Sequence, residues 1–362
     1  VESHHRLALL RLSEPFAGTP SVDNSAMFLH PNTSKLSITL NLSHPRSTEI
    51  AKKIVSISDV VVENFSANVM KKLGLGYDEL AEVKPDIIMV SASGLGHSGP
   101  YRDYRSYGPN LQALSGLTEL TGFPHNSPAG FPSSYADSMG GLTAALAALM
   151  ALNYRQKTGK GQHVDVAQFE GLCVLMDTCF LDYSANGRVH TRIGNRHPHA
   201  APHGAYKCKG EERWCVIAVF TDEEWQSLRR IVGNPSWAED ERFSTAGGRI
   251  ECADELDKLI GGWTITKTAE EVMELLQAAG IGAGVVQNAD DLFNRDPHLK
   301  ARGFYQPSVH PLLGERLNEG PPIKFSRTEA NIRRHAPIMG EHNDYVYGEL
   351  LGMSREEMEQ LH

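Results

Sequence analysis

The sequence predicts an α/β fold with a parallel sheet, followed by a smaller α+β domain. Two observations lead to this fold class. Residues 59–63 (DVVVE) and 86–93 (DIIMVSAS) are short apolar runs rich in β-branched side chains, a pattern typical of strands covered on both faces. Segments with helical spacing separate such runs, and strands that alternate with helices predict parallel βαβ units and a doubly wound sheet.

The other elements of the first domain have local signals. Isoleucines at helical spacing predict a helix over 45–57. An Ala- and Leu-rich stretch over 138–155, closed by KTGKG, predicts the longest helix. Further helices are expected at 67–73, 77–83 and 169–183, and further strands at 37–42 and 162–167.

The pattern changes after residue 200. A hairpin is predicted over 205–220, and a Gly-rich turn leads into a strand at 280–286. Between them, acidic helices are predicted at 222–232, 252–264 and 269–279. We therefore expect three parts: a large domain at 1–199, a small α+β domain at 200–310, and a C-terminal segment at 311–362 that returns to the large domain.

Composition excludes several classes of protein. The 362 residues carry a formal net charge of −9, whereas a nucleic-acid binder needs clustered Lys and Arg. No signal peptide is visible, and the most apolar stretch, 140–152, is shorter than the roughly 18 residues of a membrane span. Five cysteines without CxxC spacing indicate reduced thiols. We expect a cytoplasmic protein.

The GLGHSG motif at 94–99 fits G-x-G-x-x-G and follows a predicted strand. A dinucleotide site also needs a helix directly after the glycines, because its N-terminus holds the pyrophosphate. Here PYRD follows, which is typical of a turn. The motif therefore favours a glycine loop that shapes another kind of pocket over an NAD site.

Asp137 is the foremost candidate for a catalytic residue. It stands at the start of the longest predicted helix, shortly before Gly140 and Gly141. A carboxylate near a helix N-terminus stays ionised, and the two glycines would let a substrate approach the backbone. The same position suits a helix N-cap. The residues alone do not decide between these roles.

Two other sets of polar residues have an ordinary structural interpretation. Glu170, at the start of the next predicted helix, is either a second carboxylate of the site or a solvent-facing acid of the first turn, and we favour the second role. Four histidines lie in a Gly- and Pro-containing loop at 190–203. We expect these to be solvated side chains, and we expect no metal site.

Seven sequence blocks follow one another in a characteristic order: NTSKLSITLNL (32–42), DVVVENF (59–65), LGLGY (73–77), SGLGHSGPY (93–101), TGKGQHVDV (158–166), GEH (340–342) and LLG (350–352). Together they resemble the class III CoA-transferase family (CaiB/BaiF type). That family includes formyl-CoA and carnitine CoA-transferases and the α-methylacyl-CoA racemases. Each block is modest alone, but the resemblance runs over essentially the whole chain.

The resemblance implies a Rossmann-like large domain plus a small domain, with two protomers threaded through one another as an interlocked homodimer. The family's catalytic Asp stands just before the small-residue helix, which is the position of Asp137. Its CoA contacts come from the VENF block and the positions around it. The matching residues are Asn64, Phe65 and Lys72, with Leu40 and Arg105 matched more loosely.

The implied activity is transfer of coenzyme A from an acyl-CoA thioester to a free carboxylic acid. Asp137 would pass through an acyl anhydride and an enzyme–CoA thioester, because a carboxylate nucleophile splits one difficult exchange into easier steps. The oxyanions need preorganised donors, for which the backbone of Gly140 and Gly141 or a small-domain glycine loop are candidates. Lys72 and Arg105 would contact CoA phosphates. Coenzyme A enters as a substrate, and no metal is implied.

Two alternatives and two departures accompany this interpretation. A racemase would need a second acid/base, yet the His of the racemase motif is replaced by Tyr107. Some family members act as heteromers, so a non-catalytic subunit is the other alternative. Gly108 stands where related transferases often carry an acid, so a helper carboxylate is either missing or replaced by Glu170. The family normally begins with a further strand and helix, so we expect the N-terminus to be truncated and CoA binding to be weakened.

Overall fold

The computed structural model describes residues 1–359 and divides into two compact units. The first unit comprises Val1–Leu111, Ser134–Leu172 and the residues from Asp296 onward. The second comprises Gln112–Ser133 and Cys173–Arg295. In this division the C-terminal part of the chain belongs with the first unit. The three domain ranges predicted from the sequence rest on local patterns and stay predictions.

A parallel sheet forms the centre of the first unit. Its strands are β1 (Val60–Glu63), β2 (Ile88–Ser91) and β3 (Gln162–Asp165), in the order β1-β2-β3. All four residues of β2 are buried, as its apolar sequence predicted. In the register, Glu63 pairs with Ser91 and Ser91 pairs with Asp165. The carboxyl ends of all three strands therefore meet at one edge, where α/β sheets usually bind their ligands.

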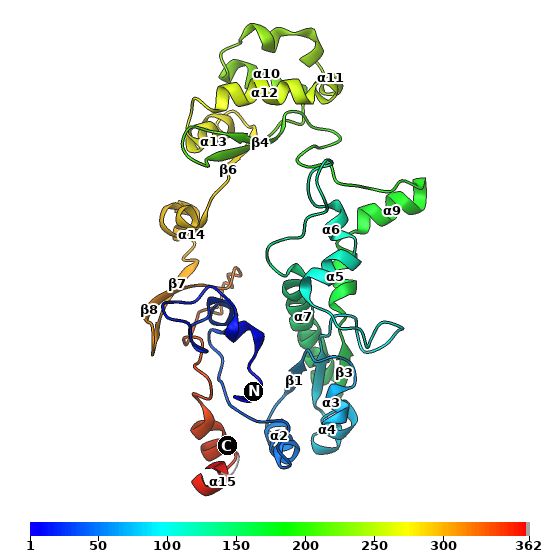
Figure 1. Cartoon of the computed structure of the whole chain (residues 1–362), viewed down its shortest axis with the longest axis vertical. Coiled ribbons are helices and arrows are strands. Elements are labelled where there is room, and N and C mark those ends of the chain that lie inside the picture. Colours follow the sequence, from blue (N-terminus) through cyan, green and yellow to red (C-terminus); the bar gives the residue numbers. More distant parts are fainter. Residues whose placement is uncertain (360–362) are drawn as a thin grey trace. The chain divides into compact units, whose positions relative to one another are not determined.

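Helices cover both faces of this sheet. The long helix α7 (Tyr135–Thr158) lies against the sheet (Figure 1). It packs small side chains, among them Ala144 and Ala151, against Ile88 and Val90 of β2. The opposite face of the strand belongs to another core cluster, in which Met89 packs with residues of α2 (Ser47–Ser56) and α4 (Tyr77–Val83). The short helix α3 (Val69–Lys72) precedes α4. The predicted α/β fold is thus confirmed, with a three-stranded parallel sheet.

Helix α7 is longer than the sequence predicted. It starts at Tyr135 and ends where Gly159 adopts a φ of +73°, a left-handed conformation that glycine tolerates. Within the part of the chain that is described, α7 is long and apolar enough to cross a membrane by length and composition alone. The expectation that no segment meets this criterion was therefore wrong. Core helices of soluble proteins can meet it as well.

Two predicted elements differ from the structure. Residues 37–42 form no strand but an extended segment with one parallel bridge, Glu2 to Thr39, because only a short piece of the N-terminal chain lies beside them. The helix predicted over 169–183 is two helices, α8 (Gln168–Val174) and α9 (Asp177–Asn186). The second segment of the first unit ends at Leu172, within α8, so the chain passes from one unit to the other close to this break.

The second unit contains the predicted hairpin and acidic helices. Strands β4 (His203–Lys207), β5 (Trp214–Ala218) and β6 (Gly282–Val285) form an antiparallel sheet in the order β4-β5-β6. Its helices α10 (Asp222–Ile231) and α13 (Ala269–Gln277) each begin with a Thr/Glu capping box. The other elements assigned wholly to this unit are α6 (Leu117–Leu120), α9, η3 (Ser236–Glu239), η4 (Glu241–Phe243), α11 (Ala246–Glu251), α12 (Ala253–Thr264) and η5 (Asp291–Arg295).

The N-terminal part and the C-terminal part of the described chain both belong to the first unit and lie side by side there (Figure 1). The N-terminal part holds η1 (Leu9–Leu12), α1 (Ala26–Leu29) and η2 (His30–Asn32). The C-terminal part holds α14 (Pro297–Ala301), the hairpin β7 (Tyr305–His310) and β8 (Gly314–Glu319), η6 (Asp344–Leu350) and α15 (Arg355–Glu359). Ser34 joins them, because its N–H donates to the Arg334 carbonyl at 3.0 Å.

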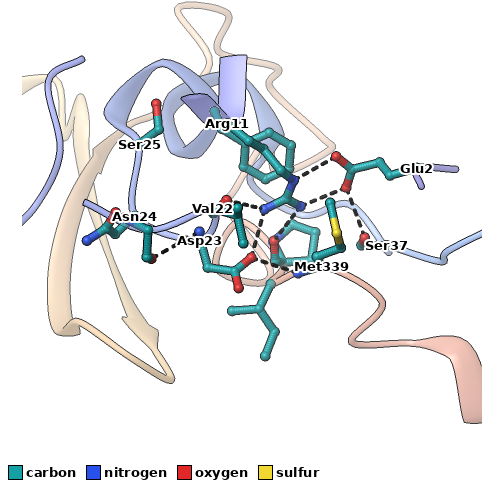
Figure 2. A network of polar contacts seen from close by, with 12 residues as sticks. Glu2, Arg11, Val22, Asp23, Asn24, Ser25, Ser37 and Met339 are labelled. Atoms are coloured by element: carbon teal, nitrogen blue, oxygen red, sulfur yellow. Dashed lines mark hydrogen bonds and ion pairs between the residues drawn. The ribbon is translucent and has the colours of Figure 1, made fainter. Parts of the chain in front are cut away.

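A fully buried arginine fastens these two parts of the chain together. Figure 2 shows Arg11 between two carboxylates: its guanidinium makes a bidentate pair with Glu2 at 2.6 and 2.7 Å and donates to Asp23 at 2.8 Å. The same group donates to the carbonyl of Pro337 at 3.4 Å. Asp23 in turn accepts from the N–H of Met339 at 2.8 Å. One side chain thus links residues near the N-terminus to a segment that lies 326 positions away in the sequence.

Candidate active site

A cavity of about 220 Å³ lies in the first unit and contains Asp137. Its walls come from the loops after β1 and β2, from the turn before α5 (Gly108–Leu114) and from the first turns of α7 and α8. Polar groups dominate the lining. The residues are Asn64, Phe65, Ser66, Ser93, Gly94, Leu95, Arg102, Tyr104, Ser106, Tyr107, Gly108, Asp137 and Gln168.

Asp137 is the third residue of α7, with Ser134 in the N-cap position. The alternative role as an N-cap was therefore wrong, because the helix starts three residues earlier than that role requires. The side chain is exposed, and no described hydrogen bond or ion pair engages its carboxylate. The carboxylate is thus free to react with a ligand in the cavity.

The two glycines after Asp137 have different surroundings. They lie inside α7 rather than in a turn, so their N–H groups belong to the helix ladder and are not free donors. A Cβ on Gly140 would come within 2.7 Å of Gln168 Cγ, whereas a Cβ on Gly141 would meet nothing within 4 Å. Neither glycine lines the cavity. The absence of a side chain at Gly140 therefore makes room for Gln168. The helix leaves no free backbone N–H at either glycine to bind an oxyanion.

Alanine at each glycine gives a matched pair of variants. We expect Gly141→Ala to raise the free energy of unfolding by about 1 kcal/mol, because alanine favours an exposed helical position. Gly140→Ala should lower it by about 1–2 kcal/mol, because the new methyl group displaces Gln168 from its packed position. The same variant should reduce kcat/KM for CoA transfer. Denaturant unfolding and steady-state kinetics check both results, and equal effects of the two variants would contradict this role of Gly140.

The loop after β1 brings two of the predicted CoA contacts, Asn64 and Phe65, into the cavity lining. Glu63 fixes this loop. Its side chain is almost completely buried, and Oε2 accepts the Phe65 N–H at 2.7 Å. The other oxygen, Oε1, lies 3.5 Å from Nε2 of His97, which belongs to the 94–99 loop. One carboxylate therefore joins the two loops that follow β1 and β2.

We expect Glu63→Ala to weaken acyl-CoA binding more than the chemical step. Its loss leaves the Phe65 N–H without an acceptor, which costs about 1–3 kcal/mol when the group is buried. The KM for acyl-CoA should then rise about 10-fold with a smaller change in kcat. Glu63→Gln keeps an oxygen for the Phe65 N–H and should restore most of the KM. A Gln variant as impaired as the Ala variant would show that the charge, not the loop geometry, matters.

Three other predicted CoA contacts lie outside the cavity. Leu40 is buried in a core cluster with Ile50 and Tyr347. Lys72 is exposed at the end of α3. Arg105 is also exposed, and Arg102, three residues earlier, lines the cavity in its place. The cavity thus contains two of the five predicted CoA contacts. It also contains one cation, Arg102, that the sequence analysis did not predict.

The structure also shows cavity residues that the sequence analysis missed. Ser93 follows β2, and Gln168 starts α8. These two are adjacent because Gln168 N–H donates to the Ser93 carbonyl at 3.1 Å, which extends the pairing of β2 with β3. The available signal was the position of each residue at the carboxyl end of a predicted strand, since Ser93 is the last residue of 86–93 and Gln168 follows 162–167. The other missed residues are Ser66, Tyr104 and Ser106.

The glycine loop at 94–99 shapes the cavity rather than a dinucleotide site. A Cβ on Gly94 would lie 1.9 Å from Ser106 Oγ and 2.8 Å from Ser106 Cβ, so a larger residue there would displace Ser106 from the cavity wall. The His97 N–H donates to both oxygens of Asp165, at 3.1 and 3.0 Å. Residues 100–107 form no helix, so the loop lacks the helix N-terminus that would hold a pyrophosphate.

The structure also bears on two positions of the family pattern, Tyr107 and Gly108. Tyr107 lines the cavity, whereas Gly108 has no room for a side chain, because a Cβ there would lie 1.7 Å from Ser134 Oγ. Glu170 is exposed in the first turn of α8 and does not line the cavity. Between residues 1 and 359, no group of three or more His, Cys, Asp or Glu side chains is placed to hold a metal.

Comparison with known proteins decides the family. The family model described as CoA-transferase family III matches residues 1–343. The chain belongs to CoA-transferase family III. The family III chain is 34% identical over 328 residues to a succinyl-CoA–D-citramalate CoA-transferase of Chloroflexus aurantiacus, covering 91% of this chain and 81% of that one. It is 32% identical over 350 residues to a succinyl-CoA–L-malate CoA-transferase beta subunit of the same organism, covering 95% and 85%.

A solved structure shows the same fold. The crystal structure of a CaiB/BaiF family protein from Brucella suis matches this chain with a TM-score of 0.88 and 30% identity, covering 96% of this chain and 90% of that one. The mixed α/β architecture described above is therefore the CaiB/BaiF fold. The protein is a CoA-transferase, and acyl-CoA thioesters are the substrates of its family.

Proposed function

We propose that this CoA-transferase moves coenzyme A between two carboxylic acids through covalent intermediates on Asp137. The observation that carries the proposal is the position of an unpaired, helix-end carboxylate in the same cavity as Asn64 and Phe65 of the predicted CoA-binding block. A nucleophile needs this combination of free access and a nearby binding site.

The exchange would proceed by acyl transfers at carboxyl carbons. An Asp137 oxygen attacks the thioester carbonyl carbon of the donor. The C–S bond breaks, CoA departs as its thiolate, and an acyl-aspartyl anhydride remains on the enzyme. The thiolate attacks the aspartyl carbonyl carbon, which releases the donor acid and forms an aspartyl–CoA thioester. The acceptor carboxylate then attacks that carbon and expels the thiolate. Attack of the thiolate on the acceptor's acyl carbon gives the new acyl-CoA and restores the Asp137 carboxylate.

Racemisation of a 2-methylacyl-CoA is the alternative reaction. It would need two groups that exchange a proton at the α-carbon. The cavity offers Asp137 on one side, but Tyr107 stands at the position of the racemase His. The cavity therefore lacks the imidazole that the racemase motif supplies as its second acid/base. Transfer is therefore the better-supported reaction, and deuterium uptake without an acceptor acid would favour the alternative.

The test is chemical trapping of the intermediate. The chain is incubated with a panel of acyl-CoA thioesters and then with hydroxylamine or borohydride, and the peptide containing Asp137 is examined by mass spectrometry. A hydroxamate or a reduced side chain at Asp137 is the expected result. An unmodified Asp137 peptide across the panel, together with CoA transfer in the same samples, would overturn the covalent mechanism.

Neither partner acid is fixed by the fold, but the relatives indicate a class. Two of them are named for transfer from succinyl-CoA to D-citramalate or L-malate. We propose short polar dicarboxylic acids as substrates of this chain too. The polar lining of the cavity supports this class. A long alkyl or aromatic acid would leave the amide and hydroxyl groups of the lining without hydrogen-bond partners.

We also propose that α7 packs against a second protomer. Its outer face carries four large apolar side chains that are each at least 60% exposed: Leu142, Leu146, Leu149 and Met150. A soluble protein rarely leaves such a stripe uncovered. The interlocked homodimer is the assembly we favour, and a heteromer is the alternative because one relative is named as a beta subunit. The mass of the purified chain in solution distinguishes a monomer from either assembly.

A further inference from the structure

Ser93 has a buried hydroxyl that no described residue uses. The residue is 5% exposed, and its Oγ has no hydrogen-bond partner within residues 1–359. Other buried side-chain atoms in the described chain also lack partners, but Ser93 is the member of that group that lines the cavity with Asp137. An unsatisfied buried hydroxyl is costly, so its presence at a cavity wall calls for an acceptor that arrives with a ligand.

The backbone around Ser93 is held on both sides. Its carbonyl accepts from the Gln168 N–H at 3.1 Å, and the next carbonyl, that of Gly94, accepts from the Phe169 N–H at 2.9 Å. The preceding carbonyl, that of Ala92, accepts from Gln168 Nε2 at 3.0 Å. These bonds leave rotation of the hydroxyl as the main freedom of the residue. A donor fixed in this way binds a ligand with little loss of entropy.

The rest of the lining limits what the ligand can be. The cavity holds about 220 Å³ and presents hydroxyl groups of Ser66 and Ser106, amide groups of Asn64 and Gln168, and one cation, Arg102. This space suits a short acid better than a long acyl chain. The lining suits an acid that carries oxygen beyond its reacting carboxyl group, because each such oxygen can accept a hydrogen bond from the wall.

We propose that Ser93 determines acid specificity: its hydroxyl donates a hydrogen bond to a second oxygen-bearing group of a short acid whose carboxyl group reacts at Asp137. The inference rests on the proposed transfer reaction and adds to it a residue that selects dicarboxylic or hydroxycarboxylic acids over alkanoic acids of equal length. A site built to bond a substrate oxygen rejects the analogue that lacks it, because the buried donor is then left unpaired.

The test combines one protein variant with one change of substrate. Transfer to succinate and to butyrate is measured for the wild type and for Ser93→Ala, with acetyl-CoA, butyryl-CoA and succinyl-CoA as donors. We expect kcat/KM for succinate to fall by roughly 10–100-fold in Ser93→Ala, the size of a hydrogen bond to a charged group. The value for butyrate should change by less than about 2-fold. Dividing the fold-change in kcat/KM for succinate by that for butyrate isolates the contribution of the contact between Ser93 and the second carboxylate.

Ser91→Ala is the matched control. Ser91 is equally buried and lies two residues earlier, but its Oγ already has a partner, His163 Nε2 at 2.9 Å, and it does not line the cavity. This variant should leave the succinate-to-butyrate ratio unchanged and lower thermal stability. Ser93→Ala should leave thermal stability equal or higher, because it removes an unpaired buried hydroxyl.

The outcomes separate the two proposals. A wild type that does not prefer succinate, or a preference that persists in Ser93→Ala, overturns the role of Ser93 while the transfer reaction stands. A wild type that transfers CoA to no acid overturns the proposed function, and the inference falls with it. Loss of the preference in Ser93→Ala, with the Ser91→Ala ratio unchanged, supports the role.

Discussion

Asp137→Asn is expected to abolish CoA transfer, lowering kcat/KM by roughly 10⁴-fold or more, as removal of a covalent nucleophile does in other enzymes. The amide matches the carboxylate in size and cannot form the anhydride. Because Asp137 is exposed and no described residue pairs with it, the substitution breaks no internal contact. Thermal stability should therefore stay close to that of the wild type while activity is lost.

A second acid of similar setting provides the control for this experiment. Asp78 lies in the first turn of α4, is exposed and does not line the cavity, so Asp78→Asn should retain full transfer. Glu170→Gln, measured in the same series, decides whether the exposed first-turn acid of α8 assists the reaction. Transfer by Asp137→Asn at more than a few per cent of the wild-type rate would contradict nucleophilic catalysis by Asp137.

Arg11→Met is expected to lower the free energy of unfolding of the first unit by about 3 kcal/mol, at the low end for a buried charge that loses its partner. Methionine fills similar space but leaves the Glu2 and Asp23 carboxylates without their shared cation. The contact between the N-terminal segment and Pro337 is lost as well. Arg6→Met, at an exposed position five residues earlier, should change stability by less than about 0.5 kcal/mol.

The two units allow this effect to be located. All four tryptophans, Trp214, Trp225, Trp237 and Trp263, lie in the second unit, so their fluorescence reports unfolding of that unit. Amide hydrogen exchange of peptides from residues 1–40 and 334–343 reports the network around Arg11. We expect faster exchange in both peptides and an unchanged fluorescence transition. A shift of the fluorescence transition alone would contradict a local role for Arg11.

The same network predicts how the effect depends on pH. Burial opposes ionisation of Glu2, but the hydrogen bonds and charge of Arg11, with a further bond from Ser37, hold its pKa below the ordinary value. A carboxylate with a lowered pKa in the folded state contributes stability above its unfolded pKa, and this contribution is lost as pH falls through the lowered pKa. The stability difference between wild type and Arg11→Met should therefore shrink as pH falls below about 4.

Several elements could be predicted because their signals are local. The β-branched run before Glu63 forms β1, and the small residues of α7 pack on the sheet as an Ala-rich helix can. The order of the sequence blocks indicated the family, which comparison with known proteins confirmed. Asp137 could be singled out as the candidate nucleophile because its signal, an acid at the start of a small-residue helix, lies within a few residues.

Other features depended on contacts between distant segments. Residues 37–42 have a strand-like alternation, but a strand needs a continuous partner, and only a short piece around Glu2 lies beside them. The burial of Leu40 also depended on distant segments, because Leu40 packs in a core cluster with residues near 50 and 347. The end of α7 that holds Asp137 started earlier than predicted, which changed Asp137 from an N-cap candidate to a first-turn residue.

The sequence by itself determined the fold class, most of the strands and helices, the family and the candidate nucleophile, because short-range periodicity and ordered motifs encode them. The tertiary structure alone decided the composition of the cavity. Ser93 and Gln168 meet because β2 and β3 pair in parallel, 75 positions apart, and Gly140 is small because Gln168 packs against it. Such contacts leave no local sequence pattern, because each of these residues is required by a neighbour that is distant in the sequence and becomes adjacent only on folding.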